Sequence, residues 1–570
     1  MLTSSLRVLI TWGHISGFPA IRGAAVALLA IGIALPAGAA DPARLGHLEF
    51  PTSGAAAAQA PFMEGILLLH SFEYEDAREA FRKAREIDPG FAMAAWGEAM
   101  TFNHPIWREV DLEAGRAALR TFAPTPEERQ AKASTQREKD FLAAVEILYG
   151  EGTKLERDIA YSEAMGRMAA RYPDDMEPRA FHALSILGTA QGVRDHRTYM
   201  KAAAVAEEVY RVNPEHPGAL HYLIHSYDDP EHAVLGLRAA RVYARVAPAA
   251  SHAQHMISHI YVALGYWDET VDANEKSFRV SEERAQRKGL PLHSRSHHAL
   301  HWLQYAYLQE GRYEDAWKLM EIMDADAAAS GKSGDLWYHA MMRAGWLVET
   351  RRFDRVPGAM ATVGVSIAGA AAGEFATGLV ALEKGDTAAA RSAHAALLTR
   401  LGAGAVAGDE HAQCATPMNA PTDTQAAEVM GKELEGLIAW QDGEREKAVA
   451  LMTQATELED AMPFEFGPPV VVKPSHEMLG EMLLETDRPA EALAAFDESL
   501  ARAPRRSLSL LGKARAAGRL DMPMLAMETW DTLGKIWQKA DADLPEFQDL
   551  RRRIDEARRA ASPALPGSGL

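Results

Sequence analysis

Cysteine is almost absent from this chain, because Cys414 is the only one among 570 residues. A single thiol excludes an intramolecular disulfide framework. It also excludes zinc or iron–sulfur sites that are built from several cysteines. Any metal site would therefore have to use histidine and carboxylate ligands.

Positive charge is also scarce. Lys and Arg number 60 against 79 Asp and Glu, which gives a formal net charge of −19. This charge would repel phosphate, and no basic stripe is large enough to offset it, so we expect no nucleic-acid partner. The longest apolar run, at residues 24–35, is short for a membrane span.

That apolar run has the flanks of a secretory signal. Two arginines precede it, and a proline followed by four small residues occupies positions 36–40. This order predicts a signal peptide at residues 1–40 with cleavage near Asp41, and a periplasmic or secreted protein of a bacterium. No cysteine stands at the cleavage site to carry a lipid, and we expect no membrane span after cleavage.

Runs of β-branched residues are rare, whereas Ala, Leu, Glu, Arg and Met are abundant and favour helices. From about residue 60 onward the pattern is helix, short turn, second helix and a stop at proline or aspartate. The first clear unit has Gly65 in its first helix, Ala77 and Phe81 in its second helix, and a stop at Pro89. A strong later unit spans residues 480–504.

These units resemble the tetratricopeptide (TPR) repeat, in which small residues let paired helices approach closely. The resemblance covers most of the chain after the signal segment. It implies an all-α fold, a TPR-type α-solenoid of helix-turn-helix repeats in a right-handed superhelix. TPR repeats most often serve as interaction modules, so a protein partner is expected.

Two segments interrupt the repeats. Residues 401–430 include a stretch rich in Gly, Ala and polar residues that predicts a linker. Residues 462–474 are rich in proline and aromatic residues, which excludes regular helix and predicts an extended strap against the solenoid. The expected organisation is an N-terminal array at 41–400, the linker, a C-terminal array at 431–562 and a disordered tail at 563–570.

Histidines are concentrated between residues 216 and 301, which hold eleven of the twenty-one. His221 and His225 recur one repeat of 34 residues later as His255 and His259. In the TPR family, certain places of each first helix line the concave groove. The register of this sequence puts these four there, together with His252, His298 and His301.

Residues four apart share a helix face, and adjacent helices lie roughly 8–10 Å apart, so imidazoles on neighbouring helices can converge on one ion. We therefore expect one metal site from His221, His225, His255 and His259. A possible second site would use His252, His298 and His301. Imidazole ligands suit zinc, copper, iron or nickel and discriminate poorly among them.

Other polar residues fall at neighbouring places of the groove. Asp228 or Asp229 could supply an oxygen ligand, or an acceptor that fixes the orientation of an imidazole. Gln191, Tyr305 and Tyr338 are possible additional groove residues.

Three classes of function remain open at this point. The groove could bind a transition metal, or a small ligand through it, for delivery, storage or assembly of another protein. The metal could instead be catalytic, or the chain could be a plain TPR interaction scaffold without metal. The sequence marks no general base and no substrate pocket, so it assigns no reaction.

Overall fold

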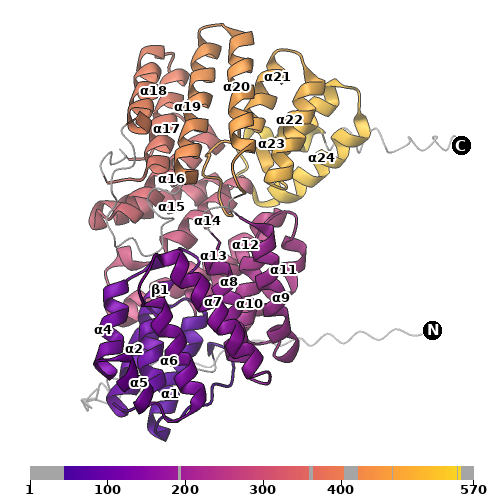
Figure 1. Ribbon diagram of the computed structural model, residues 1–570. Coiled ribbons are helices and arrows are strands. Elements are labelled where there is room, and N and C mark those ends of the chain that lie inside the picture. The colour runs from indigo at the N-terminus through magenta and orange to yellow at the C-terminus, as the bar shows by residue number, and fades with distance from the viewer. Residues whose placement is uncertain are drawn as a thin grey trace, which may run out of the picture. The chain divides into compact units, whose positions relative to one another are not determined.

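The fold is seen in a computed structural model, which describes residues 44–190, 194–358, 364–402, 421–464, 466–548 and 550–553. The predicted signal peptide, Gln191 and the predicted tail at 563–570 lie outside these ranges. Helices dominate the described residues, and consecutive helices lie side by side (Figure 1).

The first part of the array runs to residue 264. Its helices are α1 (Ala56–His70), α2 (Tyr74–Ile87), α3 (Ala92–Met100), α4 (Leu112–Phe122), α5 (Pro126–Lys132), α6 (Gln136–Leu148), α7 (Lys154–Arg171), α8 (Met176–Gly188), α9 (His196–Val212), α10 (Pro217–Ser226), α11 (Ala233–Val246) and α12 (Ser251–Leu264).

The array then continues to the C-terminal part of the chain. Its helices are α13 (Trp267–Lys288), the short η2 (Leu292–Ser294), α14 (His297–Gln309), α15 (Tyr313–Ser330), α16 (Ser333–Thr350), α17 (Ile367–Glu383), α18 (Thr387–Gly402), α19 (Pro421–Gln441), α20 (Arg445–Asp460), α21 (Ser475–Glu485), α22 (Pro489–Arg502), α23 (Ser507–Arg519), α24 (Pro523–Ile536) and η3 (Trp537–Lys539).

Small residues let these helices approach closely, as the repeat pattern predicts. The ring of Phe81 lies so near Gly65 of α1 and Gly97 of α3 that an added Cβ would come within 2.6 and 2.4 Å of it. In the C-terminal part, Phe496 fills the same place between two other glycines, one on α21 and one on α23. The predicted all-α array of helix-turn-helix repeats is confirmed.

Two segments of the described chain depart from the helical pattern. A short antiparallel hairpin pairs β1 (Asn103–His104) with β2 (Glu109–Val110). The described residues of the predicted strap at 462–474 contain no helix, as expected. The predicted linker was too long, because α19 begins at Pro421, where a proline is well tolerated in the first turn of a helix.

The apolar core also divides at a different place from the predicted linker. One large cluster of buried side chains draws on residues from 45 to 273, and the other on residues from 262 to 550. The two clusters meet around α12 and α13, so the first repeats of the array pack as one core.

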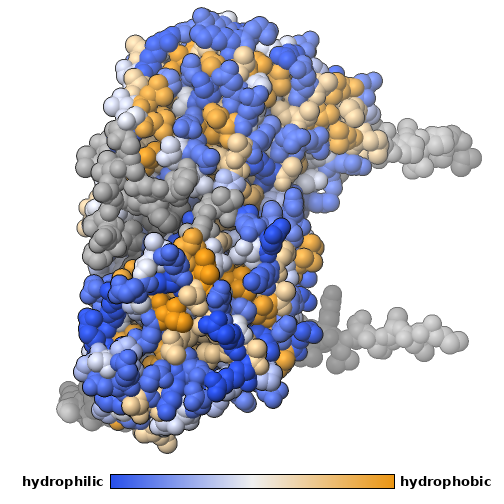
Figure 2. Space-filling model, viewed as in Figure 1, coloured by the Kyte–Doolittle hydropathy of each residue, from blue (hydrophilic) through white to orange (hydrophobic). Residues whose placement is uncertain are grey.

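The N-terminal part of the array closes on itself. Helix α1 contacts α10, and the extended segment before α1 lies against other repeats, with Phe50 packed on Trp96 and Phe141. The face in Figure 2 is mostly hydrophilic, with apolar patches between the polar side chains. None of the described helices is long and apolar enough to cross a membrane.

Candidate metal centre

Helices α10, α12 and α14 carry the central histidines. Each is the first helix of its pair, and one α-helix separates each from the previous one, with the short η2 also lying between α12 and α14. The side chain of His216 caps α10 by accepting from the N–H of Ala219, and Gly265 ends α12 in the left-handed conformation (φ 65°). These ends fix where each helix places its histidines.

The first histidine group consists of His221 and His225 on α10 and His252 in the first turn of α12. Their ligand nitrogens all lie within 4.8 Å of one another. The Nε2 atoms of all three are buried and have no hydrogen-bond partner among the residues that the structure describes. A buried nitrogen without a partner is costly, so this group offers three converging nitrogens to a ligand.

The second histidine group consists of His255 and His259 on α12 and His298 in the first turn of α14. Its ligand nitrogens also lie within 4.8 Å of one another. A tetrahedral ion with nitrogen–metal distances of 2.0–2.1 Å needs nitrogens about 3.4 Å apart. Small side-chain rotations would therefore close either group around an ion.

The two groups are one arrangement used twice. In each group, two histidines that lie four residues apart on one helix are joined by a third. The third histidine comes from the first turn of the helix that opens the following helix pair. The third copy starts with His301 on α14, but it continues with Tyr305 and Tyr338 instead of two further histidines. The histidine arrangement therefore ends after two copies.

Hydrogen bonds made by the Nδ1 atoms, here called outer bonds, fix the tautomers of His255 and His259 in the second group. His259 Nδ1 lies 2.5 Å from the Asp228 carboxylate, and His255 Nδ1 lies 2.7 Å from Asn274 Oδ1. The Asn274 amide nitrogen already donates to the Thr270 carbonyl, so its oxygen is the acceptor. Both histidines therefore donate from Nδ1 and, as neutral imidazoles, carry a lone pair on Nε2.

These two lone pairs face each other. The Nε2 atoms of His255 and His259 are 3.0 Å apart, although neither bears a proton in this tautomer. Two acceptors at this distance repel unless a cation or a proton lies between them. This contact is the strongest single sign of a metal site in the described part of the chain.

The first group has a similar outer bond. His221 Nδ1 lies 2.7 Å from the backbone carbonyl of His70, which can only accept, so His221 also presents a lone pair on Nε2. Metal-binding imidazoles commonly donate their other nitrogen to a carbonyl or carboxylate, which raises their basicity.

Burial favours the neutral form of five of these six imidazoles. It lowers the pKa of His221, His225, His252 and His255 well below the usual value, with further lowering by neighbouring imidazoles. For the same reasons the pKa of His298 falls to about 3. Neutral imidazole is the form that binds a metal.

Aromatic rings enclose both groups. Phe72 lies 4.2 Å from His221 between ring centroids, and Trp302 lies 4.3 Å from His259. Phe72 holds a left-handed backbone conformation (φ 56°), which is strained for a bulky residue and frequent near functional sites. Trp107 and Phe466 add further rings, from the hairpin and the strap.

The open groove predicted for these histidines is therefore filled. His221, His225, His255 and His259 have exposed fractions of 4 % or less, and only His252 and His298 are partly exposed. The physical reason is that the α1–α2 turn, the hairpin and the strap all place aromatic side chains on the groove. The candidate centre is a buried chamber.

The structure groups the predicted histidines differently, although the residues do come together. The first helices of successive pairs are offset along their axes by about one turn. The first turn of α12 therefore lies beside the middle of α10, and α14 lies against α12 in the same way. His252 thus joins His221 and His225 of α10, and His298 joins His255 and His259 of α12. His301 is in neither group, because it is buried against Trp337 and Tyr338.

The other predicted residues have separate roles. Asp228 is the acceptor for His259, whereas Asp229 pairs with Arg194 and His232 and does not join either group. Tyr338 lies 3.1 Å from His298 Nδ1 through its hydroxyl. Tyr305 accepts from the buried guanidinium of Arg506.

A third buried set, His70, Glu177 and His216, is satisfied internally. His70 bridges Tyr222 and Glu177, and His216 bridges Glu177 and the N–H of Ala219. All its ring nitrogens are thus in use, so this set is a structural network. Neither this network nor Asn274 was predicted from the sequence. Asn274 lies in the second helix of its pair, with no motif around it.

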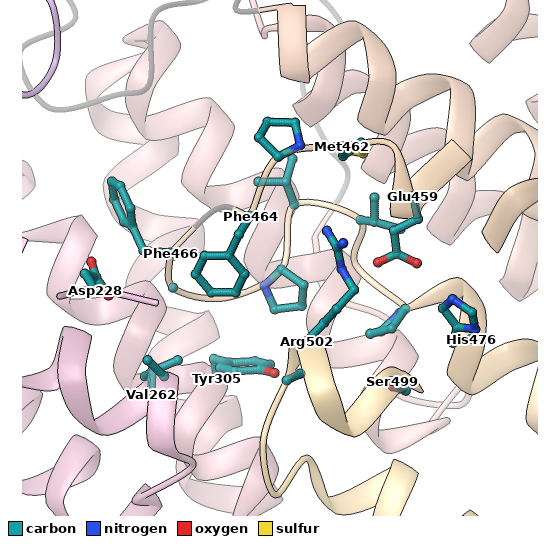
Figure 3. Close-up of a pocket in the computed structure, with 18 of the residues that line it drawn as sticks. Asp228, Val262, Tyr305, Glu459, Met462, Phe464, Phe466, His476, Ser499 and Arg502 are labelled. Atoms are coloured by element: carbon teal, nitrogen blue, oxygen red, sulfur yellow. The ribbon is translucent and has the colours of Figure 1, made fainter. Parts of the chain in front are cut away.

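A cavity of about 90 Å³ lies beneath the strap, next to the second group. Asp228 and Phe466 line it, together with Phe464, Tyr305 and Arg502. Figure 3 shows the strap looping around it, with Arg502 reaching toward the strap from the end of α22. The strap therefore covers the second group and borders a small, mainly apolar space.

No protein-family model matches this sequence, and no curated protein matches it. Several solved structures align along most of its length. The APC/C hetero-tetramer Cut9–Hcn1 aligns at 10% identity, covering 88% of this chain and 77% of that chain, with a TM-score of 0.30. Yeast Tom70 aligns at 11%, covering 87% and 92%, with a TM-score of 0.30.

The human IFIT1 dimer with m7Gppp-AAAA aligns at 12% identity, covering 90% of this chain and 92% of that chain, with a TM-score of 0.33. These likenesses are too distant to bear on function. The assignment of this chain as a TPR-like helical array rests on the helix pairs described above.

Proposed function

We propose that this protein binds transition-metal ions through its two histidine groups. Zinc, copper, iron and nickel all accept imidazole ligands. The observation that carries the proposal is the contact between the lone pairs of His255 and His259 at 3.0 Å. The three unpartnered Nε2 atoms of the first group support it independently.

The chemistry of the chamber favours a metal over a peptide. A peptide groove needs donors and acceptors that clamp a backbone or carboxylate, whereas this chamber presents neutral imidazoles and aromatic rings. We infer an exported metal-binding protein that serves the storage or delivery of metal or the assembly of another protein, with a protein partner on another surface. A periplasmic or secreted location and that partner are part of the proposal.

Metal analysis of untagged protein tests the proposal. We expect metal that survives purification, or that binds stoichiometrically when zinc, copper, nickel or iron is added, and a higher unfolding temperature in its presence. The His221→Ala/His225→Ala variant should lose the metal of the first group. Protein that neither retains nor binds any of these metals would overturn the proposal.

His301→Ala is the matched control. His301 is a buried imidazole of the same helical array, but it lies outside both groups. Its removal should leave the metal content unchanged. Loss of metal in this variant with a folded protein would favour the grouping expected from sequence alone.

A further inference from the structure

We infer that the two histidine groups form one dinuclear centre, in which two metal ions share a small bridging anion. This inference rests on the proposed metal binding and adds to it the number of ions, their coupling and the class of ligand.

The first reason is the contact between the groups. The rings of His225 and His259 lie 5.7 Å apart between centroids, and those of His252 and His255 lie 6.1 Å apart. These are only slightly longer than the separations of 4.9–5.1 Å from the His221 ring to the His225 and His252 rings within the first group. The six imidazoles thus form a continuous cluster, with the first group facing the second.

The second reason is the number of ligands. Three imidazoles per ion leave at least one coordination position open, as in catalytic zinc sites. The partly exposed members are His252 and His298, one in each group. An open position on each ion is available to a small ligand.

The third reason is charge. Two divalent ions held by six neutral imidazoles carry four positive charges in a buried chamber. Asp228 is the carboxylate bonded to this cluster through a side chain, and its second oxygen has no hydrogen-bond partner among the described residues. A second carboxylate, that of Glu73, accepts from the backbone N–H of His252. Two carboxylates do not offset four positive charges, so an anion from solvent is favoured.

The size of the chamber restricts that anion. Phe72, Trp107, Trp302 and Phe466 pack directly on the imidazoles, so little room remains above them. The geometry fits a small oxygen- or nitrogen-donor anion such as hydroxide or azide. No redox step is needed for this binding.

Copper(II) gives the sharpest test, because coupled and isolated ions have different electron paramagnetic resonance spectra. Wild-type protein loaded with two equivalents should show a strongly broadened or depleted signal, because the two ions interact. His252→Ala and His298→Ala should each bind one equivalent and show the full signal of an isolated copper ion.

Azide then tests the bridge. We expect one azide per two copper ions in the wild type, and a lower azide affinity in each single-group variant. A wild-type spectrum equal to the sum of the two variant spectra would overturn the dinuclear centre and leave metal binding intact. Absence of stoichiometric copper would contradict metal binding itself, and the dinuclear centre with it.

The His301→Ala variant again serves as control, since it removes a neighbouring buried imidazole from outside both groups. Its copper-loaded spectrum should match that of the wild type. An isolated-copper spectrum from this variant would show that His301 is a ligand and would overturn the assignment of the two groups.

Discussion

Asp228→Asn isolates the outer hydrogen bond of the second histidine group. The Asp228 carboxylate accepts from His259 Nδ1 at 2.5 Å, which fixes the tautomer and makes Nε2 a stronger donor to a metal. Asparagine keeps the shape and one acceptor oxygen but removes the charge. The metal ligands themselves are unchanged in this variant.

We expect the metal affinity of the second group to fall about 10- to 100-fold, which is the usual effect of losing such a partner and corresponds to about 1.4–2.7 kcal/mol. The affinity of the first group should change little, because its known outer bond goes to the His70 carbonyl. The assay is a metal titration against a chelator of known affinity, in the His252→Ala background where only the second group is intact.

Asp229→Asn is the matched control, because it changes the neighbouring carboxylate, which pairs with Arg194 and His232. It should leave metal affinity unchanged. Equal affinity in Asp228→Asn and the wild type, or an equal loss in both variants, would refute the role given to this hydrogen bond.

Three further perturbations test the packing around the centre. Glu177→Gln should lower the free energy of unfolding by about 3 kcal/mol at pH 7, measured by denaturant titration, without changing metal content. Although burial alone would raise it, the histidine partners lower the pKa of Glu177 to about 2. The contribution of Glu177 to stability is therefore present above about pH 4.5 and is lost as the pH falls toward 2. The stabilities of the variant and the wild type should converge in acid, and a difference that stays constant with pH would contradict this. Arg506→Met should lower the free energy of unfolding by about 3–5 kcal/mol, since it removes the cation paired with the buried carboxylate of Glu349 and leaves Glu477 with Lys473 alone as a cationic partner; a neutral effect would refute this. Gly467→Ala places a Cβ 2.4 Å from the Trp302 ring at a left-handed φ of 96°, which should displace the strap. Protease should then cleave the strap faster, and the second group should bind metal more weakly. Wild-type behaviour in both assays would contradict the covering role of the strap.

The repeats and the histidine pairs could be predicted from sequence because both depend on local periodicity. A spacing of four residues puts His221 beside His225, and His255 beside His259, in any helix. The close glycine contacts of Phe81 follow from the repeat pattern in the same way. These features need no knowledge of the tertiary arrangement.

The grouping and the burial could not be predicted, because they depend on contacts between distant segments. The offset between α10 and α12 decides that His252 belongs with His221, and nothing local encodes that offset. Phe72 and Phe466 close the chamber from residues far from the histidines in sequence. Asn274 acquires its role only because α13 packs against α12.

X-ray absorption by the metal-loaded protein tests the histidine coordination most directly. With two zinc ions bound, we expect about three imidazole nitrogens per ion at about 2.0–2.1 Å, with the multiple-scattering pattern of imidazole rings. His221→Ala/His225→Ala protein should keep one such ion. A shell of oxygen donors without imidazole scattering in the wild type would contradict the proposed centre.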